Sequence, residues 1–168
     1  MTLLDAPEFD EAHERRRLVV FYSTAGLLFV LFVGFWLAAG RPVDYPWYWN
    51  SHLRGRMAVN SFLGAVEKND LPAAYGIWIH DKDWQQHPAV KQTYTYGRFQ
   101  QDWSSHSPDN EYGSIQSHRI VEATMHGNVL LMAIYINGRK SKALDLDYDP
   151  ASHTLNFSPE DVQLYLGP

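Results

Sequence analysis

A continuous stretch without charged residues runs from Leu18 to Ala39 and constrains this chain more than any other feature. Its 22 positions would extend about 33 Å as an α-helix, and the hydrocarbon core of a bilayer is about 30 Å thick. A helix satisfies its own backbone hydrogen bonds in lipid. The sequence therefore predicts one transmembrane helix over residues 18–39.

Two other structures suit an apolar stretch of this kind. A buried core helix normally keeps a polar face, and this stretch has none. A cleaved signal peptide fits the small residues at Ala38, Ala39 and Gly40, but its apolar core is usually only about 7–15 residues long. We expect a retained span, with both alternatives open.

The charges that flank the stretch indicate its orientation. Residues 1–17 form a polar tail, which we expect to be flexible, and the tail ends in Arg15, Arg16 and Arg17. Only Arg41 adjoins the other end. Because basic residues are retained on the cytoplasmic side, we expect a single-pass protein of the cell inner membrane with its N-terminus in the cytoplasm and its C-terminal domain outside.

Residues 40–50 form a proline-containing linker that is rich in aromatic residues. Two prolines, Pro42 and Pro46, stop a helix from continuing. Flat amphipathic rings favour the headgroup layer of a bilayer. We therefore expect a membrane-interface belt, with packing beneath the folded domain as the alternative, at four residues: Tyr45, Trp47, Tyr48 and Trp49.

The composition excludes several classes of site. The formal net charge of the 168 residues is −5, which disfavours a large nucleic-acid surface. The chain has no cysteine, so it has no disulfide, thiolate zinc site or thiol nucleophile. No glycine-rich phosphate cradle follows a predicted strand. We therefore predict no cofactor, and the expected partners are the lipid bilayer and a protein, with the oligomeric state left open.

Beyond the linker, the first half of the domain has helical patterns. Asn50 or Ser51 can cap a helix that runs to about Asn69, and four apolar residues recur with helical spacing: Val59, Phe62, Leu63 and Val66. Asp70 can cap a second helix with Pro72 in its first turn. A third helix is predicted over Tyr94–Trp103.

The second half of the domain has strand patterns. The apolar run Val129–Ile136 predicts a central strand that is covered on both faces, and Asn137-Gly138 predicts a tight hairpin. The next strand alternates, which predicts Leu144, Leu146 and Tyr148 inward and three aspartates outward. Leu155 and Phe157 are expected inward on a further strand. Helices followed by an antiparallel meander make an α+β domain over residues 51–168.

The stretch Phe62–Tyr75, followed by Trp78, resembles the opening of nuclear transport factor 2-like domains, also called cystatin-like cones. Two helices meet there at an Asn/Gly-Asp break that precedes Ala-Tyr. The Phe99–Trp103 element also resembles uncharacterised bacterial membrane-anchored proteins that join such a domain to one N-terminal span. The resemblance extends over about residues 51–158.

This resemblance implies a cone-shaped domain of about three helices on a curved antiparallel sheet, with a conical pocket. A short early strand pair is common in the superfamily, and Lys91–Thr95 is the one candidate here. The superfamily includes enzymes, small-ligand binders and assembly factors, so the fold does not select a function.

Polar clusters in the domain give no convincing catalytic or metal site. Imidazole and carboxylate groups gather at His80, Asp81, Asp83 and His87, but without a ligand spacing typical of metal sites. Ser104, Ser105 and His106 lack a nucleophile-elbow motif. His118 and His126 would share a strand face unless a bulge intervenes, and His153 could join them. We expect the carboxylates Asp145, Asp147 and Asp149 to lie on a solvated sheet face.

Aromatic residues on the predicted helices are the better candidates for function. Most are expected to be core, and one or two to line a residual pocket or a partner-binding surface. They are Tyr75, Trp78, Tyr96, Phe99 and Trp103. We expect a non-catalytic domain that binds a partner protein or supports a membrane assembly. The alternatives are an enzyme that uses His/Asp acid–base chemistry in the cone and a protein that binds a small apolar ligand.

Overall fold

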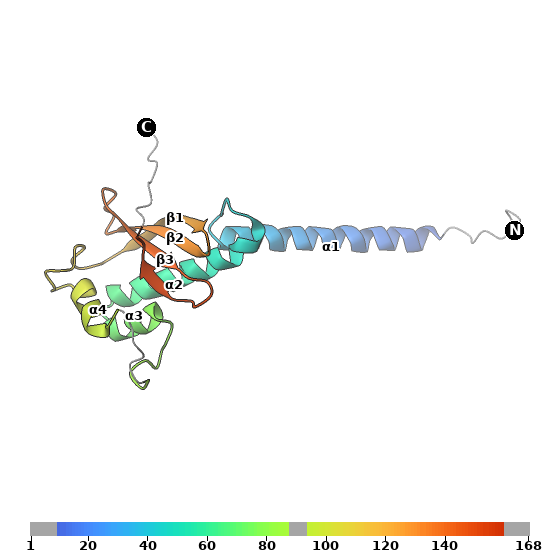
Figure 1. Cartoon of the computed structure of the whole chain (residues 1–168). Coiled ribbons are helices and arrows are strands. Elements are labelled where there is room, and N and C mark those ends of the chain that lie inside the picture. Colours follow the sequence, from blue (N-terminus) through green and yellow to red (C-terminus); the bar gives the residue numbers. More distant parts are fainter. Residues whose placement is uncertain (1–9, 88–93, 160–168) are drawn as a thin grey trace, which may run out of the picture. The chain divides into compact units, whose positions relative to one another are not determined.

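The structure is a computed structural model that describes residues 10–87 and 94–159 (Figure 1). The chain divides into two compact units, one that ends at Ala38 and one that begins at Ala39. In the described part, helices and one antiparallel sheet make the chain α+β, as predicted. The elements are α1 (Glu11–Ala38), the 3₁₀ helix η2 (Pro46–Tyr48), α2 (Trp49–Glu67), α3 (Leu71–Trp78), α4 (Tyr96–Trp103), β1 (His118–His126), β2 (Val129–Ile136), β3 (Ala143–Tyr148) and β4 (Leu155–Phe157).

Helix α1 begins before the apolar stretch. The Asp10 carboxylate accepts hydrogen bonds from the backbone nitrogens of Ala12 and His13, at 3.0 and 3.1 Å, and so caps the helix. Glu11 and Glu14 lie in the first turn, where negative charge favours the helix dipole. Residues 11–17, which we expected to be a flexible tail, are therefore helical.

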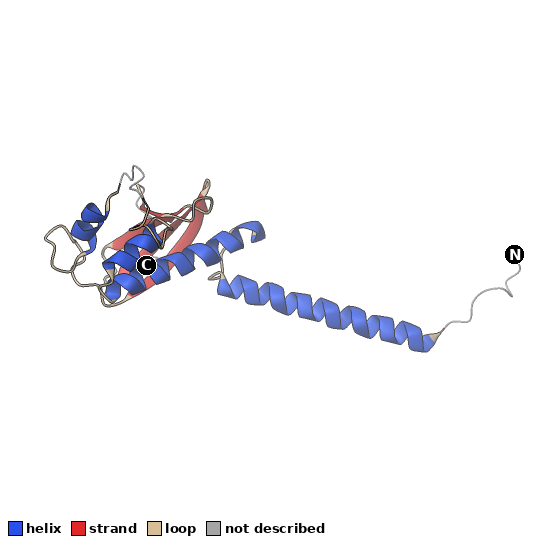
Figure 2. Cartoon of the chain, turned by 90° about the horizontal axis from the view of Figure 1, so that it is seen from below, coloured by secondary structure: helices blue, strands red, loops and turns tan. Residues whose placement is uncertain are grey.

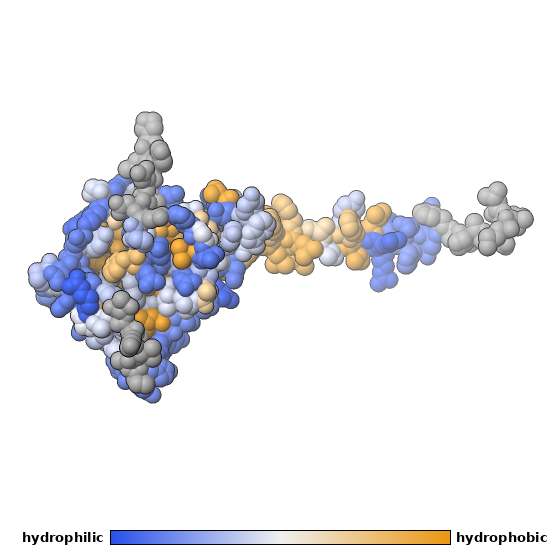
Figure 3. All heavy atoms as spheres, in the orientation of Figure 1, coloured by the Kyte–Doolittle hydropathy of each residue, from blue (hydrophilic) through white to orange (hydrophobic). Residues whose placement is uncertain are grey.

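Helix α1 is long and apolar enough to cross a membrane by length and composition. It has 28 residues, and none of them is buried within the chain. Figure 3 shows the change along α1 from a hydrophilic first part to a hydrophobic remainder. A core helix of a soluble domain would be buried, whereas a signal sequence near the N-terminus can also meet this criterion of length and composition.

Helix α2 presents the predicted apolar stripe to the core. It begins at Trp49, slightly earlier than Asn50 or Ser51, because the turn of η2 leads directly into it. The stripe residues are all buried: Val59, Phe62, Leu63 and Val66. Figure 2 shows α2 lying along one face of the sheet.

Helices α3 and α4 begin at side-chain caps. The Asp70 carboxylate accepts a hydrogen bond from the backbone nitrogen of Ala73 at 3.2 Å, as predicted. Thr95 caps α4 in the same way, by accepting from Arg98 N, so this helix begins at Tyr96 rather than Tyr94. Residues 91–93 of the predicted strand Lys91–Thr95 lie outside the described residues.

The sheet is an antiparallel meander in the order β1-β2-β3-β4. Strand β2 is buried from Leu130 to Ile134, so both of its faces are covered, as predicted. The cross-strand register places Leu144, Leu146 and Tyr148 on the same face as alternate β2 residues of the core. That face is the one packed against the helices.

The predicted tight turn forms after β2, since the backbone nitrogen of Arg139 donates to the carbonyl of Ile136 at 3.0 Å, but the two strands do not pair directly beyond it. Asn137 and Gly138 both have positive φ, 52° and 70°, as the turn requires. Strand β3 nevertheless begins only at Ala143. The Asn137 side chain instead bonds the segment before β1: its Oδ1 accepts from the nitrogens of Gln116 and Ser117, at 2.8 and 3.2 Å. The connection is therefore wider than a two-residue hairpin.

Helix α2 approaches the sheet closely at Gly55, which is buried. A Cβ atom at this position would lie 2.5 Å from Leu130 Cδ2 and 3.1 Å from Tyr148 Cδ1. Both of these side chains are themselves buried, so neither has free space to move into. The spacing between α2 and the sheet thus requires a residue without a side chain.

We expect Gly55→Ala to destabilise the domain by about 1–3 kcal/mol, because the added methyl overpacks the core. Gly64→Ala is the matched control in the same helix, since a Cβ there meets no atom within 4 Å. It should be neutral or stabilising by up to about 1 kcal/mol. Thermal unfolding of the full chain in detergent measures both, and equal stabilities would contradict the close approach.

Candidate functional site

The aromatic residues singled out in the sequence lie together in the domain interior. Four are buried and Tyr96 is half-buried. Phe62 of α2 stands nearly perpendicular to Trp103, with ring centroids 4.8 Å apart, and edge-to-face to Trp78 at 5.2 Å. The ring centroids of Tyr75 and Phe99 are 5.2 Å apart. These rings fill the space between the helices and the sheet.

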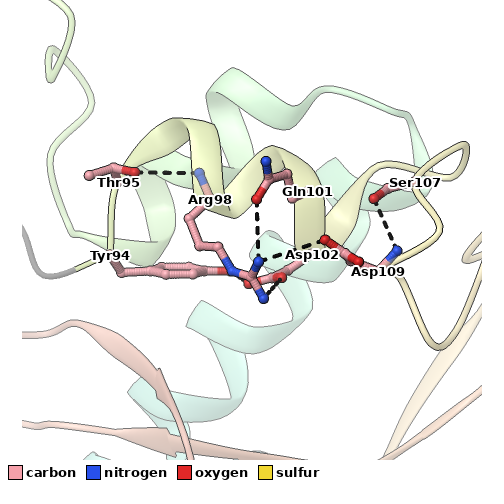
Figure 4. Close-up of polar contacts among 7 residues, drawn as sticks. All are labelled: Tyr94, Thr95, Arg98, Gln101, Asp102, Ser107 and Asp109. Carbon is pink, nitrogen blue, oxygen red and sulfur yellow. Dashed lines mark hydrogen bonds and ion pairs between the residues drawn. The ribbon is translucent and has the colours of Figure 1, made fainter.

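A polar cluster surrounds Asp102 on α4 (Figure 4). Its carboxylate accepts a hydrogen bond from the Tyr94 hydroxyl at 2.8 Å and forms an ion pair with the Arg98 guanidinium at 3.0 Å. Arg98 also reaches Gln101 and, at 3.7 Å, Asp109. Burial, with the Asp102 carboxylate as second cause, raises the pKa of Tyr94 well above its usual value. The Tyr94 hydroxyl therefore stays protonated near neutral pH and donates to Asp102.

Beside this cluster lies a cavity of about 220 Å³. Its lining combines aromatic rings with three carboxylates and one guanidinium: Arg98, Asp102, Trp103, Asp109, Glu111, Tyr112 and Phe157. Trp103 is the only one of the five predicted aromatic candidates in this lining. Phe157 faces inward, as predicted, with its ring centroid 5.0 Å from that of Trp78 and 5.8 Å from that of Trp103, but 44% of the residue stays exposed.

Trp103 and Tyr112, two aromatic residues of the lining, differ in their hydrogen bonding. The Trp103 indole nitrogen is buried and makes no hydrogen bond to any part of the chain that the structure describes. The Tyr112 hydroxyl donates to the carbonyl of Ala143 at 3.2 Å, and burial raises the pKa of Tyr112 to about 12. Lys142 pairs with Glu111 beside the Tyr112 ring.

The linker aromatics divide between two environments. Tyr45 and Trp47 are 65% and 67% exposed and stack on one another, with centroids 4.5 Å apart and planes within 7°. Tyr48 is half-buried. Trp49 is buried, and its indole nitrogen donates to the Asp44 carbonyl at 3.0 Å. The first pair suits an interface belt, whereas Trp49 packs into the domain.

The linker is fastened to the domain by a pair of residues that sequence reasoning missed. His52 of α2 is 1% exposed, and its Nε2 donates to the Asp44 carboxylate at 2.7 Å. The same carboxylate oxygen accepts from the backbone nitrogen of Met125, in β1, at 3.2 Å. No local pattern predicts this contact, because the linker, α2 and β1 meet only in the folded domain.

The scattered histidines do not form one site. A bulge between Ile120 and Glu122 changes the strand alternation, so His118 lies on the helix-covered face and His126 on the other. His118 bonds to Glu67 Oε1 at 2.6 Å and Asn60 Oδ1 at 3.1 Å, both on α2. His153 bonds to the Tyr148 hydroxyl instead.

The other polar clusters stay close to the surface. His87 and Asp81 pair at 2.6 Å, and this hydrogen bond raises the pKa of His87 and lowers that of Asp81. His80 contacts the ring of His153 rather than this pair. No group of three metal-ligating side chains occurs in the described ranges. Asp145, Asp147 and Asp149 are half-buried rather than fully solvated.

The basic cluster at the N-terminal part of α1 is exposed. Arg17 lies 3.9 Å from Glu14, one turn earlier on the helix, while Arg15 and Arg16 occupy neighbouring positions. Ser105 bonds to His106 Nδ1 at 3.0 Å in the loop after α4, and within residues 10–87 and 94–159 no further group orients the imidazole.

Comparison of the chain with protein-family models, with curated proteins and with solved structures finds no match.

We expect Asp44→Ala to destabilise the domain by about 1–3 kcal/mol, because it leaves the buried His52 ring and the Met125 nitrogen without their acceptor. Asp44→Asn, which keeps an acceptor oxygen, should lose less. Asp83→Ala, in an exposed turn, is the control. Thermal unfolding and proteolysis of residues 39–49 measure the effect; an Asp44→Ala protein as stable and as protease-resistant as the control would contradict it.

Proposed function

We propose that this chain is a single-pass membrane protein whose C-terminal domain binds a partner protein, without catalysis, outside the cytoplasm. In this proposal α1 spans the cell inner membrane with Arg15, Arg16 and Arg17 on the cytoplasmic side. The domain then serves as a docking module, or as one subunit of a membrane assembly.

The observation that carries the proposal is the filling of the domain interior by aromatic rings. Tyr75, Trp78, Phe99 and Trp103 are each at most 3% exposed. An enzyme or a carrier of this architecture needs a hollow between the helices and the sheet that admits its ligand. With the interior occupied by side chains, the groups available for recognition are those at the surface.

The cavity beside α4 is the surface feature that best suits a partner. Aromatic faces attract cations, and the three carboxylates of the lining still outnumber the two bases that pair with them, Arg98 and Lys142, so the cavity favours positive charge. Arg98 already lies between Asp102 and Asp109, so the geometry accommodates a guanidinium. We propose that the partner inserts a lysine or arginine side chain beside Trp103 and Phe157.

We further propose that the domain is a nuclear transport factor 2-like cone in which α2, α3 and α4 pack on a curved sheet. Support comes from the helix pair joined at Asn69-Asp70, the antiparallel meander and the bulge in β1, which bends a strand.

The two alternative functions have less support. Asp102 is the most enclosed carboxylate of the cavity lining, and its oxygens are already engaged by the Tyr94 hydroxyl and the Arg98 guanidinium, which leaves it poorly placed to act on a substrate proton. The mixed polar lining also differs from the apolar cavity that a carrier of apolar ligands needs.

A photo-crosslinking phenylalanine analogue at Phe157 tests partner binding in the native membrane. Phe157 is half exposed at the cavity and is already aromatic, so the replacement disturbs little. We expect one discrete adduct. Asp109→Lys should weaken it about tenfold by placing a like charge against the basic side chain, whereas Asp83→Lys should not.

The matched crosslinking position is Met57 on α2, which is 60% exposed. The same adduct at Met57, or none at Phe157 in a protein with unchanged thermal unfolding, would reject binding at the cavity.

The absence of cysteine allows a separate test of membrane orientation. In right-side-out membrane vesicles, an impermeant maleimide should label Lys82→Cys directly and Glu11→Cys only after permeabilisation. Both positions are exposed. The reverse pattern would place the domain in the cytoplasm, and a shortened protein that lacks position 11 would indicate a cleaved signal sequence.

A further inference from the structure

We infer that residues 43–47 form a rigid lipid-contact platform, in which Val43, Tyr45 and Trp47 enter the headgroup layer of the bilayer. This inference rests on the proposed membrane anchoring by α1. It goes beyond that anchoring because it assigns a second, separate membrane contact to the folded domain itself.

The three side chains form an exposed apolar surface. Val43 is 98% exposed, and Tyr45 and Trp47 are about two-thirds exposed even though their rings stack on each other. Exposing so much apolar surface within five residues is unfavourable in water. Tyrosine and tryptophan are the side chains that concentrate at headgroup depth, because a flat apolar ring ends there in a polar group.

The platform is held by the domain and is not a loose linker. Asp44, between the exposed residues, turns inward to His52 and Met125 N, and its carbonyl accepts from buried Trp49. The backbone nitrogen of Tyr48 donates to the carbonyl of Tyr45 at 2.9 Å, which closes the turn of η2. These contacts fix the direction of the rings relative to α2 and β1.

The same inward turn removes negative charge from the platform. Asp44 is the only acid in residues 40–50, and its side chain is 20% exposed and paired with His52. Arg41 remains exposed. The outward surface therefore carries apolar rings and a base, a combination that favours a headgroup layer containing anionic lipid.

Chain length keeps the platform within reach of the bilayer. Val43 follows the last residue of α1, Ala38, by five residues, which span at most about 18 Å. The headgroup layer extends about 5–8 Å beyond the hydrocarbon core on each side. Because the platform is covalently joined to the apolar helix by only five residues, lipid is the partner that we infer for this surface.

Site-directed spin labelling of the full chain tests the platform, because a protein without cysteine takes one label per introduced thiol. The labelled variant is Val43→Cys in vesicles of phosphatidylcholine and phosphatidylglycerol. We expect frequent collisions with lipid-soluble oxygen and several-fold fewer collisions with an aqueous nickel chelate than at Lys82→Cys. Replacing both Tyr45 and Trp47 with serine should restore the nickel collisions.

A label at Leu28→Cys, near the middle of the apolar stretch of residues 18–39, separates the possible outcomes. Lipid exposure at Leu28 with water exposure at Val43 would overturn the platform and leave the span intact. Water exposure at Leu28 would overturn the anchoring itself. Low collision rates with both oxygen and nickel at Val43 would indicate a covering protein surface, which also overturns the lipid contact.

Discussion

The packing of α2 on the sheet is the constraint on which the rest of the domain depends. At Gly55 the helix comes so close to Leu130 that only hydrogen fits between them. The parts of α2 on either side of this point then reach separate structures: His52 holds the linker, Phe62 enters the aromatic interior and Glu67 bonds to β1. One helix therefore sets the positions of the linker, the interior and the first strand together.

Sequence reasoning succeeded where the signal is local. Asp70 caps α3 within one turn, and the α2 stripe repeats at helical spacing, so neighbouring residues carry the information. It failed where a side chain acts across the fold. Asn137 has the backbone that its turn demands, yet its amide serves a segment 20 residues earlier, and the β1 bulge reverses the face of His126. The alternation of apolar and polar residues along the strands predicts neither the Asn137 contact nor the bulge.

The candidate site was only partly predictable for the same reason. Burial of Tyr75 and Phe99 follows from their size and spacing. The pair Arg98 and Asp102 is detectable as opposite charges four residues apart on a helix. The remainder of the cavity lining comes from the loop after α4 and from β4, which only tertiary packing brings together. The pairing of Asp44 with His52 likewise joins the linker to α2. No spacing of polar residues in the sequence marks these two residues as partners.

The three-residue pairing of β4 has a consequence for the shape of the cavity. Phe157 opposes Leu146, and Asn156 opposes Asp147, in an edge strand held by few backbone bonds. Displacing β4 by one residue along its neighbour would exchange the two sides of the strand, so that an amide would replace the phenyl ring against Trp103. One wall of the recess beside α4 thus depends on the register of β4, and whatever strengthens the pairing of this strand at the sheet edge also preserves that wall.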